Sequence, residues 1–272
     1  MISALSIGIM QGRLLPPIKG RIQCFPADQW RDEFLLAKKA GLHLIEWIYE
    51  VDGEEANPLS TDEGIEELKA LSHFHGVCVR SLCADYFMDR PLLLSPEEGV
   101  SKLQWLIGQS AKAGIRRIIL PFVDASRLSD EAALHKVVVI LQKVTDEVRA
   151  SGLEVHLETD LAPTPFASLM GCLSEDVFFV NYDSGNSASH GYRVEEEFAA
   201  YGARISSLHI KDRVLGGGTV PLGSGNVDFK ALKTSLNAIE YQKDVILQVA
   251  RSTAGEEVKW AIHNRQIVES WL

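Results

Sequence analysis

EVHLETD, residues Glu154–Asp160, is a short run of strand-forming character that ends abruptly in carboxylates. Each of three later runs has the same design: FFVNYD ends in Asp183, ISSLHIKD contains His209 and Asp212, and VILQVAR contains Gln248. Every run therefore carries potential metal ligands at the C-terminal end of a candidate strand. If these strands lie side by side and parallel, their polar ends meet at one point.

A recurring junction between a helix and a strand favours such a parallel sheet. At each junction a predicted helix ends, a glycine caps it, and an apolar run begins within a few residues. Short loops of this kind connect helices to parallel strands. The capping glycines that we expect are Gly41, Gly76, Gly114, Gly152 and Gly202.

The order of the predicted elements defines the fold class. Strand-like runs cover residues 4–10, 42–47, 77–83, 117–122, 154–158, 177–182, 205–209 and 245–249. Helical segments, including 98–113, 130–150, 194–201, 229–239 and 256–271, separate or follow them. Alternating helices and apolar strands predict a parallel sheet covered by helices. Eight such units predict a closed (β/α)8 TIM barrel, as a single domain over residues 1–272. The alternative is an open doubly wound sheet, but its usual GxGxxG turn does not follow the first strand.

The charge and composition of the chain limit the classes of molecule that it is expected to bind. The net charge of −10 and the lack of a lysine or arginine cluster argue against nucleic acid and favour a small molecule. The four cysteines show no paired spacing, which is typical of reduced thiols in a cytoplasmic protein. We see neither a signal peptide nor a membrane-spanning run, and therefore expect no membrane partner.

Polar residues gather at the predicted strand ends, which form the active-site face of a barrel. They are Gln11, Arg13, Glu46, Asp85, Asp124, Glu158, Asp160, Asp183, Asn186, His209, Lys211, Asp212, Gln248 and Arg251. Burying several charges together is unfavourable unless they are paired or bind a cation. The excess of acids at the centre of this set predicts one divalent metal ion. Carboxylate, imidazole and amide ligands suit Mn²⁺, Mg²⁺ or Co²⁺, and Zn²⁺ is also compatible.

These motifs resemble the xylose isomerase-like TIM-barrel superfamily, and within it the sugar phosphate isomerase/epimerase branch. The resemblance is carried by IEW with Glu46, HLETDL with Glu158, VNYDSGN with Asp183, SLHIKDR with His209, and the loop VPLGSGNVDF. The motifs occur in the family's order and span nearly the full length of the chain.

The resemblance implies a set of metal ligands with one departure. In this family, Glu, Asp, His and a second Glu from the eighth strand hold the metal. The first three correspond to Glu158, Asp183 and His209, but the fourth position holds Gln248. The family's epimerases are understood to use both Glu residues as acid/bases on opposite faces of the substrate. An amide cannot take up a proton at neutral pH, although its oxygen can bind a metal.

The implied activity is that of a sugar or sugar-phosphate isomerase/epimerase of carbohydrate metabolism. Glu158 would abstract a proton next to a carbonyl and form an enediolate, which favours isomerisation if it is the single base. Alternatives stay open because of Gln248. They are dehydration, a non-catalytic barrel that binds sugar or metal, and epimerisation with a second base such as Glu46, Asp85 or His190. An endonuclease IV-like activity would need more histidine ligands and a basic surface.

Further roles follow from the resemblance. Lys211 would bind a substrate oxygen or stabilise the enediolate, and Glu46 and Asn186 would lie near the substrate. Asp212 would orient His209 or Lys211. A phosphate group of the substrate would be held by Arg213, Arg251 and Arg13, with the amides of residues 216–218. Members of the family are often dimers or tetramers, so a homo-oligomer is also expected.

Overall fold

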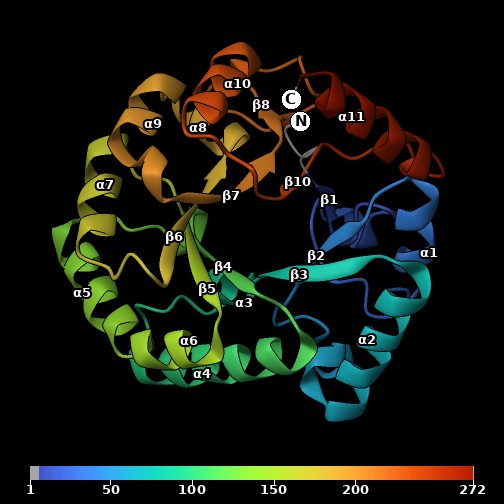
Figure 1. Ribbon diagram of the computed structural model, residues 1–272, viewed down its shortest axis with the longest axis horizontal. Coiled ribbons are helices and arrows are strands. Elements are labelled where there is room, and N and C mark those ends of the chain that lie inside the picture. Colours follow the sequence, from blue (N-terminus) through green and yellow to red (C-terminus); the bar gives the residue numbers. More distant parts are fainter. Residues whose placement is uncertain (1–5, 272) are drawn as a thin grey trace.

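The structure, a computed structural model, describes residues 6–271. Within them, eight parallel strands close into a barrel in the order β1-β10-β7-β6-β5-β4-β3-β2. Figure 1 shows these strands as a central ring with the helices outside it. The barrel strands are β1 (Ile7–Met10), β2 (Leu44–Ile48), β3 (Cys78–Cys83), β4 (Arg117–Phe122), β5 (Glu154–Thr159), β6 (Phe178–Asp183), β7 (Ile205–Ile210) and β10 (Val245–Leu247). The predicted TIM barrel is thereby confirmed.

Helices follow most strands. The α-helices are α1 (Asp32–Lys39), α2 (Asp62–His75), α3 (Tyr86–Asp89), α4 (Pro96–Ala113), α5 (Glu131–Gln142), α6 (Thr145–Ser151), α7 (Pro163–Gly171), α8 (Ser184–His190), α9 (Val194–Tyr201), α10 (Phe229–Ala238) and α11 (Glu257–Trp271). Short 3-10 turns cover Ile18–Gly20, Glu54–Ala56, Pro58–Ser60, Asp124–Ser126 and Gly202–Arg204. A small antiparallel pair, β8 (Asp212–Arg213) and β9 (Thr219–Val220), lies in the loop after β7. No helix within residues 6–271 is both long and apolar enough to cross a membrane.

Some predicted boundaries differ from the observed ones. The predicted first strand included residues 4 and 5, which lie outside the described residues. The predicted helix over 130–150 is broken into α5 and α6. At the break the Thr145 hydroxyl donates to the Leu141 carbonyl, a back-bond that bends helices.

Four of the five expected capping glycines have the left-handed conformation. Gly41, Gly76, Gly114 and Gly152 have φ values between 68° and 77°. Gly202 is the exception, because it has φ −54° and begins a 3-10 turn that leads directly into β7. Gly202 is still the C-cap residue of α9, in a right-handed conformation that does not require glycine.

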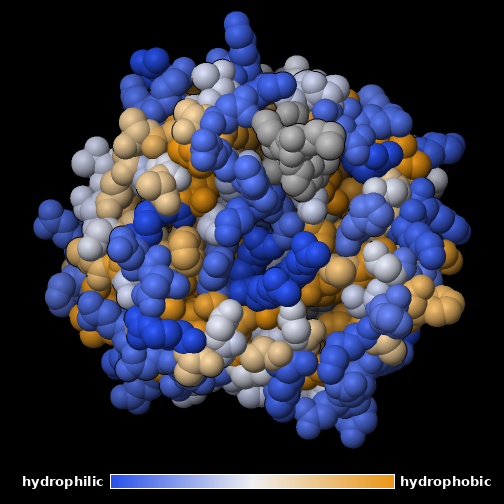
Figure 2. Space-filling view, in the orientation of Figure 1, coloured by the Kyte–Doolittle hydropathy of each residue, from blue (hydrophilic) through white to orange (hydrophobic). Residues whose placement is uncertain are grey.

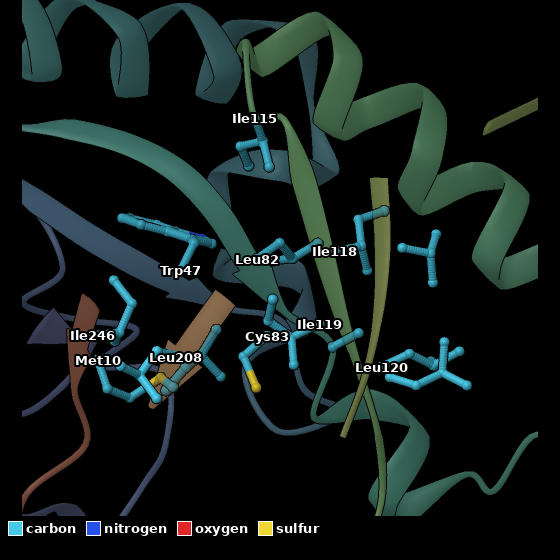
Figure 3. Packing of buried hydrophobic residues seen from close by; sticks show 14 of the residues in the cluster. Met10, Trp47, Leu82, Cys83, Ile115, Ile118, Ile119, Leu120, Leu208 and Ile246 are labelled. Atoms are coloured by element: carbon cyan, nitrogen blue, oxygen red, sulfur yellow. The ribbon is translucent and has the colours of Figure 1, made fainter. Parts of the chain in front are cut away.

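The apolar core includes the layer between strands and helices. Trp47 of β2 is fully buried, and its ring centroid lies 5.5 Å from that of Trp30 and 6.2 Å from that of Phe34 on α1. Figure 3 shows part of the buried cluster, including Met10 and Leu208. In the orientation of Figure 1, the space-filling view shows a mostly hydrophilic face with hydrophilic side chains gathered over the middle of the ring (Figure 2).

The barrel interior, in contrast, contains a row of hydrogen-bonded polar side chains. His156 of β5 lies 2.8 Å from Glu154 through Nε2 and 2.7 Å from the Ser207 hydroxyl of β7 through Nδ1. Ser207 donates to Asn181 Oδ1 (2.6 Å), and Asn181 Nδ2 donates to Glu158 (2.8 Å). Because β6 separates β5 from β7, the contact between His156 and Ser207 crosses the interior. This interior row connects the beginning of β5 to its C-terminal end.

A buried carboxyl group fixes the start of the loop after β1. Glu33 of α1 is fully buried and accepts a 2.6 Å hydrogen bond from the Gly12 N–H. Burial raises the pKa of Glu33 from 4.5 to about 8, although the Gly12 N–H acts in the opposite direction. The folded protein therefore keeps this proton at pH values where the unfolded chain has released it.

This proton makes stability depend on pH. The contribution of Glu33 is fully present below about pH 4.5 and is lost as the pH rises to about 8. Glutamine does not titrate, so we expect Glu33→Gln to remove this pH dependence of the free energy of unfolding. Between pH 5 and 8 the variant should gain a few kcal/mol of stability relative to the wild type. Urea unfolding at several pH values measures the difference. The neighbouring exposed acid provides the control, Asp32→Asn, and an equal slope in wild type and Glu33→Gln would contradict the assignment.

Candidate active site

Three candidate metal ligands meet at the C-terminal ends of neighbouring strands. Glu158 of β5, Asp183 of β6 and His209 of β7 are buried, and one ligand atom of each lies within 4.8 Å of those of the other two. Gln248 directly follows β10, the strand beside β7, and its N–H donates to the Ile210 carbonyl. The barrel thus brings the four predicted ligands to one end.

His209 lies between two carboxylates. Its Nε2 is 2.6 Å from Glu46 Oε1, and its Nδ1 is 3.1 Å from Glu158 Oε2. Burial lowers the pKa of His209, but the charge of Glu46 and the hydrogen bond with Glu158 outweigh it and raise the pKa to about 10. The pKa of Glu46 is lowered, because His209 outweighs the opposing effect of burial.

Glu46 therefore has a different position from the one predicted. It is fully buried behind His209 and is not part of the cavity lining, so it holds the imidazole instead of contacting a substrate. A carboxylate at Nε2 fixes the ring and leaves Nδ1 directed toward Glu158 and Asp183.

The donor set fits a divalent cation. Asp183 Oδ2 is buried and accepts no hydrogen bond of good geometry, although the Lys211 ammonium lies 2.8 Å away. Burial, together with the charge of Glu158, raises the pKa of Asp183. Two carboxylates that approach one imidazole in a buried site are stabilised by positive charge. Two carboxylates, an imidazole nitrogen and an amide oxygen are ligands that Mn²⁺, Mg²⁺, Co²⁺ and Zn²⁺ accept.

A row of hydrogen bonds leads from this ligand set to the opposite part of the site. Lys211 Nζ donates to Gln248 Oε1 (2.8 Å), and Gln248 Nε2 donates to Gln23 Oε1 (3.0 Å). Gln23 Nε2 in turn donates to Asp85 Oδ2 (2.8 Å). Sequence reasoning missed Gln23, because it lies in an irregular loop without a motif. It also missed Asn181, although the alternation of a strand places that residue on the same face as Asp183.

A cavity of about 590 Å³ adjoins the candidate ligands. Several of the predicted site residues line it: Glu158, Asn186, Lys211, Arg213 and Gln248, together with Asp85, Asp124, Asp160 and His190. Asn186 donates to Glu158 Oε1 and accepts from Arg213, both at 2.8 Å. The arginine therefore positions the carboxylate through the asparagine.

Arg13 and Arg251 do not reach the cavity, contrary to prediction. Arg13 donates to the carbonyls of Val249 and Ile22, and Arg251 donates to those of Ile22, Gly12 and Leu15. The two arginines follow adjacent strands, β1 and β10, and the carbonyls of the loop after β1 occupy their guanidinium groups. They fasten this loop and do not line the cavity beside the candidate ligands.

The glycine loop also differs from the predicted anion site. The amides of Gly216 and Gly217 already donate to the carbonyls of Ser189 and Val214. The Gly217 carbonyl instead accepts from the Arg213 guanidinium at 2.8 and 3.0 Å. Backbone groups engaged in this way are not available to cradle a phosphate.

Asp212 was predicted to orient His209 or Lys211. In the structure it instead organises the loop VPLGSGNVDF. Its carboxylate accepts from the backbone N–H groups of Gly223 (2.9 Å), Gly225 (2.8 Å) and Val227 (3.1 Å). A Cβ atom on Gly225 would lie 2.3 Å from Asp212 Oδ1, so the loop needs glycine at that position.

Removal of this acceptor should loosen the loop. We expect Asp212→Ala to lower the free energy of unfolding by about 2–3 kcal/mol, because three buried or partly buried N–H groups lose a charged partner. Hydrogen exchange at Gly223 and Gly225 should become faster. Ser224→Ala in the same loop is the matched control, and unchanged exchange at both glycines would contradict this role of Asp212.

Comparison with known proteins places the chain in a family. The model of the xylose isomerase-like TIM barrel family matches residues 34–269, and the chain belongs to this family. SgbU of Escherichia coli (strain K12), a candidate L-ribulose-5-phosphate 3-epimerase, is 24% identical over 261 residues, which cover 89% of this chain and 91% of SgbU.

Solved structures share the fold. An L-ribulose 3-epimerase superimposes with a TM-score of 0.76 at 18% identity, covering 98% of this chain and 94% of its own. The IOLI protein, solved with a bound zinc atom, superimposes with a TM-score of 0.77 at 17% identity. The match covers 98% of this chain and 99% of the IOLI chain. The family and the names of these relatives agree with the isomerase or epimerase class of enzyme predicted from the sequence.

Proposed function

We propose that this protein is a divalent-metal-dependent isomerase or epimerase that removes a proton next to the carbonyl group of a sugar or sugar phosphate. The observation that carries the proposal is the buried group Glu158, Asp183 and His209 beside a cavity that Glu158 itself lines. The relatives named as L-ribulose-5-phosphate 3-epimerase and L-ribulose 3-epimerase support the same class of substrate.

The residues that would hold the metal are Glu158, Asp183, His209 and Gln248. When bound there, a divalent ion polarises the substrate carbonyl and stabilises the negative charge that follows proton removal. The donor set favours Mn²⁺, Mg²⁺ or Co²⁺. Zn²⁺ is included because the similar IOLI structure contains a zinc atom.

Glu158 is the group that takes the proton. Burial raises its pKa, but the hydrogen bond and charge of His209, together with Lys211, lower it overall. The carboxylate is therefore ionised at neutral pH, as a base must be. Asn186 and Asn181 each donate to one of its oxygens at 2.8 Å and fix its orientation. Lys211, whose ammonium also borders the cavity, would bind an oxygen of the substrate.

Proton exchange with solvent tests this function. Incubation in D₂O with a panel of ketoses and ketose phosphates should give loss of a C–H signal next to the carbonyl when Mn²⁺ is present, and a chelator should stop it. Glu158→Gln should slow the exchange by about 10²–10⁴-fold, because the base is lost. NMR follows both reactions.

The matched control is Glu175→Gln, which changes an exposed acid after α7. Absence of exchange with every substrate, together with absence of bound metal, would refute the proposed function. Full exchange in Glu158→Gln would assign the base to another residue.

With Gln248 as the fourth ligand, the site should bind a metal ion more weakly than a four-ligand set that contains three carboxylates. Gln248→Glu adds a negative charge at the ligand position, and we expect it to tighten Mn²⁺ binding by about tenfold or more. Titration followed by electron paramagnetic resonance measures the affinity. The comparison variant is Gln242→Glu on the surface before β10, which should leave the affinity unchanged; an unchanged affinity in Gln248→Glu as well would remove residue 248 from the ligand set.

A further inference from the structure

Gln248 leaves the proposed reaction with one base, and the described structure offers a second carboxyl group at a different strand end. Asp85 follows β3 and lines the same cavity as Glu158. In the barrel order, β4 separates β3 from β5, so the two carboxyl groups enter the cavity from different, non-adjacent strands.

Asp85 differs from the other carboxyl groups of the cavity lining. Glu50 forms an ion pair with Arg21, and Glu158 contacts His209. Asp160 lies 3.4 Å from the His190 ring. Asp89 and Asp124 are exposed to solvent, where a charge needs no partner.

Asp85, in contrast, is buried and forms no ion pair with any of the described residues. Its carboxyl oxygens accept only from neutral donors, the Cys83 thiol (3.1 Å) and the Gln23 amide (2.8 Å). Burial raises its pKa, and the charges of Glu158 and Glu46 act in the same direction. A buried carboxyl group without a cation partner releases its proton less readily than an exposed one, which is the direction that a general acid requires.

The hydrogen-bond row described above fixes this group relative to the proposed metal ligands. Gln23 bridges Asp85 and Gln248 with its amide, and Gln248 is bound in turn by Lys211. The residue that replaces the second acid/base of the family is therefore linked through one glutamine to another carboxyl group in the same cavity.

We propose that Asp85 is the second proton-transfer group of the reaction, so that the protein is an epimerase; this inference rests on the proposed function. Glu158 removes the proton from the carbon next to the carbonyl, and the electron pair of that C–H bond enters the enediolate. Asp85 delivers its own proton to the opposite face of the same carbon, and a C–H bond of inverted configuration forms. Glu158 is then protonated and Asp85 ionised, and both return to their starting states by proton exchange with solvent.

The other candidates for this role have different surroundings. Glu46 is fully buried behind His209 and does not line the cavity. His190 does line it, but its side chain is 38% exposed and lies beside Asp160 and the Tyr192 ring. Asp85 alone of the three combines burial with a place in the cavity lining.

The test separates removal of the proton from inversion of the carbon. In D₂O with Mn²⁺ and a ketose that the wild type epimerises, Asp85→Asn should still wash the original proton out for deuterium through Glu158. Formation of the epimer should fall by about 100-fold or more. Asp85→Glu should restore part of the epimerisation. Asp28→Asn, an exposed acid outside the cavity lining, should keep the wild-type ratio of epimer to exchange.

Three results would overturn the inference. The first is that Asp85→Asn forms epimer at the wild-type rate. The second is that Asp85→Asn loses exchange, epimer formation and Mn²⁺ affinity together, which is the effect expected if Asp85 has only a structural role. The third is loss of inversion in His190→Gln with exchange retained, because it assigns the role to His190. The failure of the proposed function is recognised separately, since the wild type would then show no exchange with any substrate.

Discussion

The contact of His209 with two buried carboxylates is the constraint around which the site is built. Glu46 reaches Nε2 from β2, and Glu158 reaches Nδ1 from β5, on different sides of the barrel. These distances are satisfied only if the barrel is closed and the registers of β2, β5 and β7 are correct. The geometry of the site therefore depends on the closure of the barrel.

The sequence was sufficient to predict the barrel because its alternating helices and strands follow from periodicity. Strand-like runs after helices define the sheet, and the C-terminal ends of its strands lie on the face of the barrel that carries the site. Strand-end position placed Glu158, Asp183 and His209 among the polar candidates, and the family resemblance selected them as metal ligands. Asn181 and Glu46 show the limit, because the same alternation places them inside without indicating which neighbour they contact.

Loop residues were predicted less well for a physical reason. Arg13 and Arg251 were expected to bind phosphate, yet they satisfy carbonyl groups of a loop whose path no sequence pattern indicates. Asp212 was expected to touch a ligand, yet three N–H groups that follow it by 11 to 15 positions surround it. Gln23 has no regular structure around it and became visible only through its contacts with Gln248 and Asp85.

The polar interior row from Glu154 to Glu158 gives the two faces of the barrel strands different roles. The apolar packing that includes Trp47 and Phe34 lies between strands and helices, whereas residues on the inner face of β5 carry hydrogen bonds to the site. Substitutions in the two layers therefore act on different properties of the protein. Laboratory evolution could raise thermal tolerance by repacking the outer layer while the inner hydrogen bonds that hold Glu158 are left unchanged.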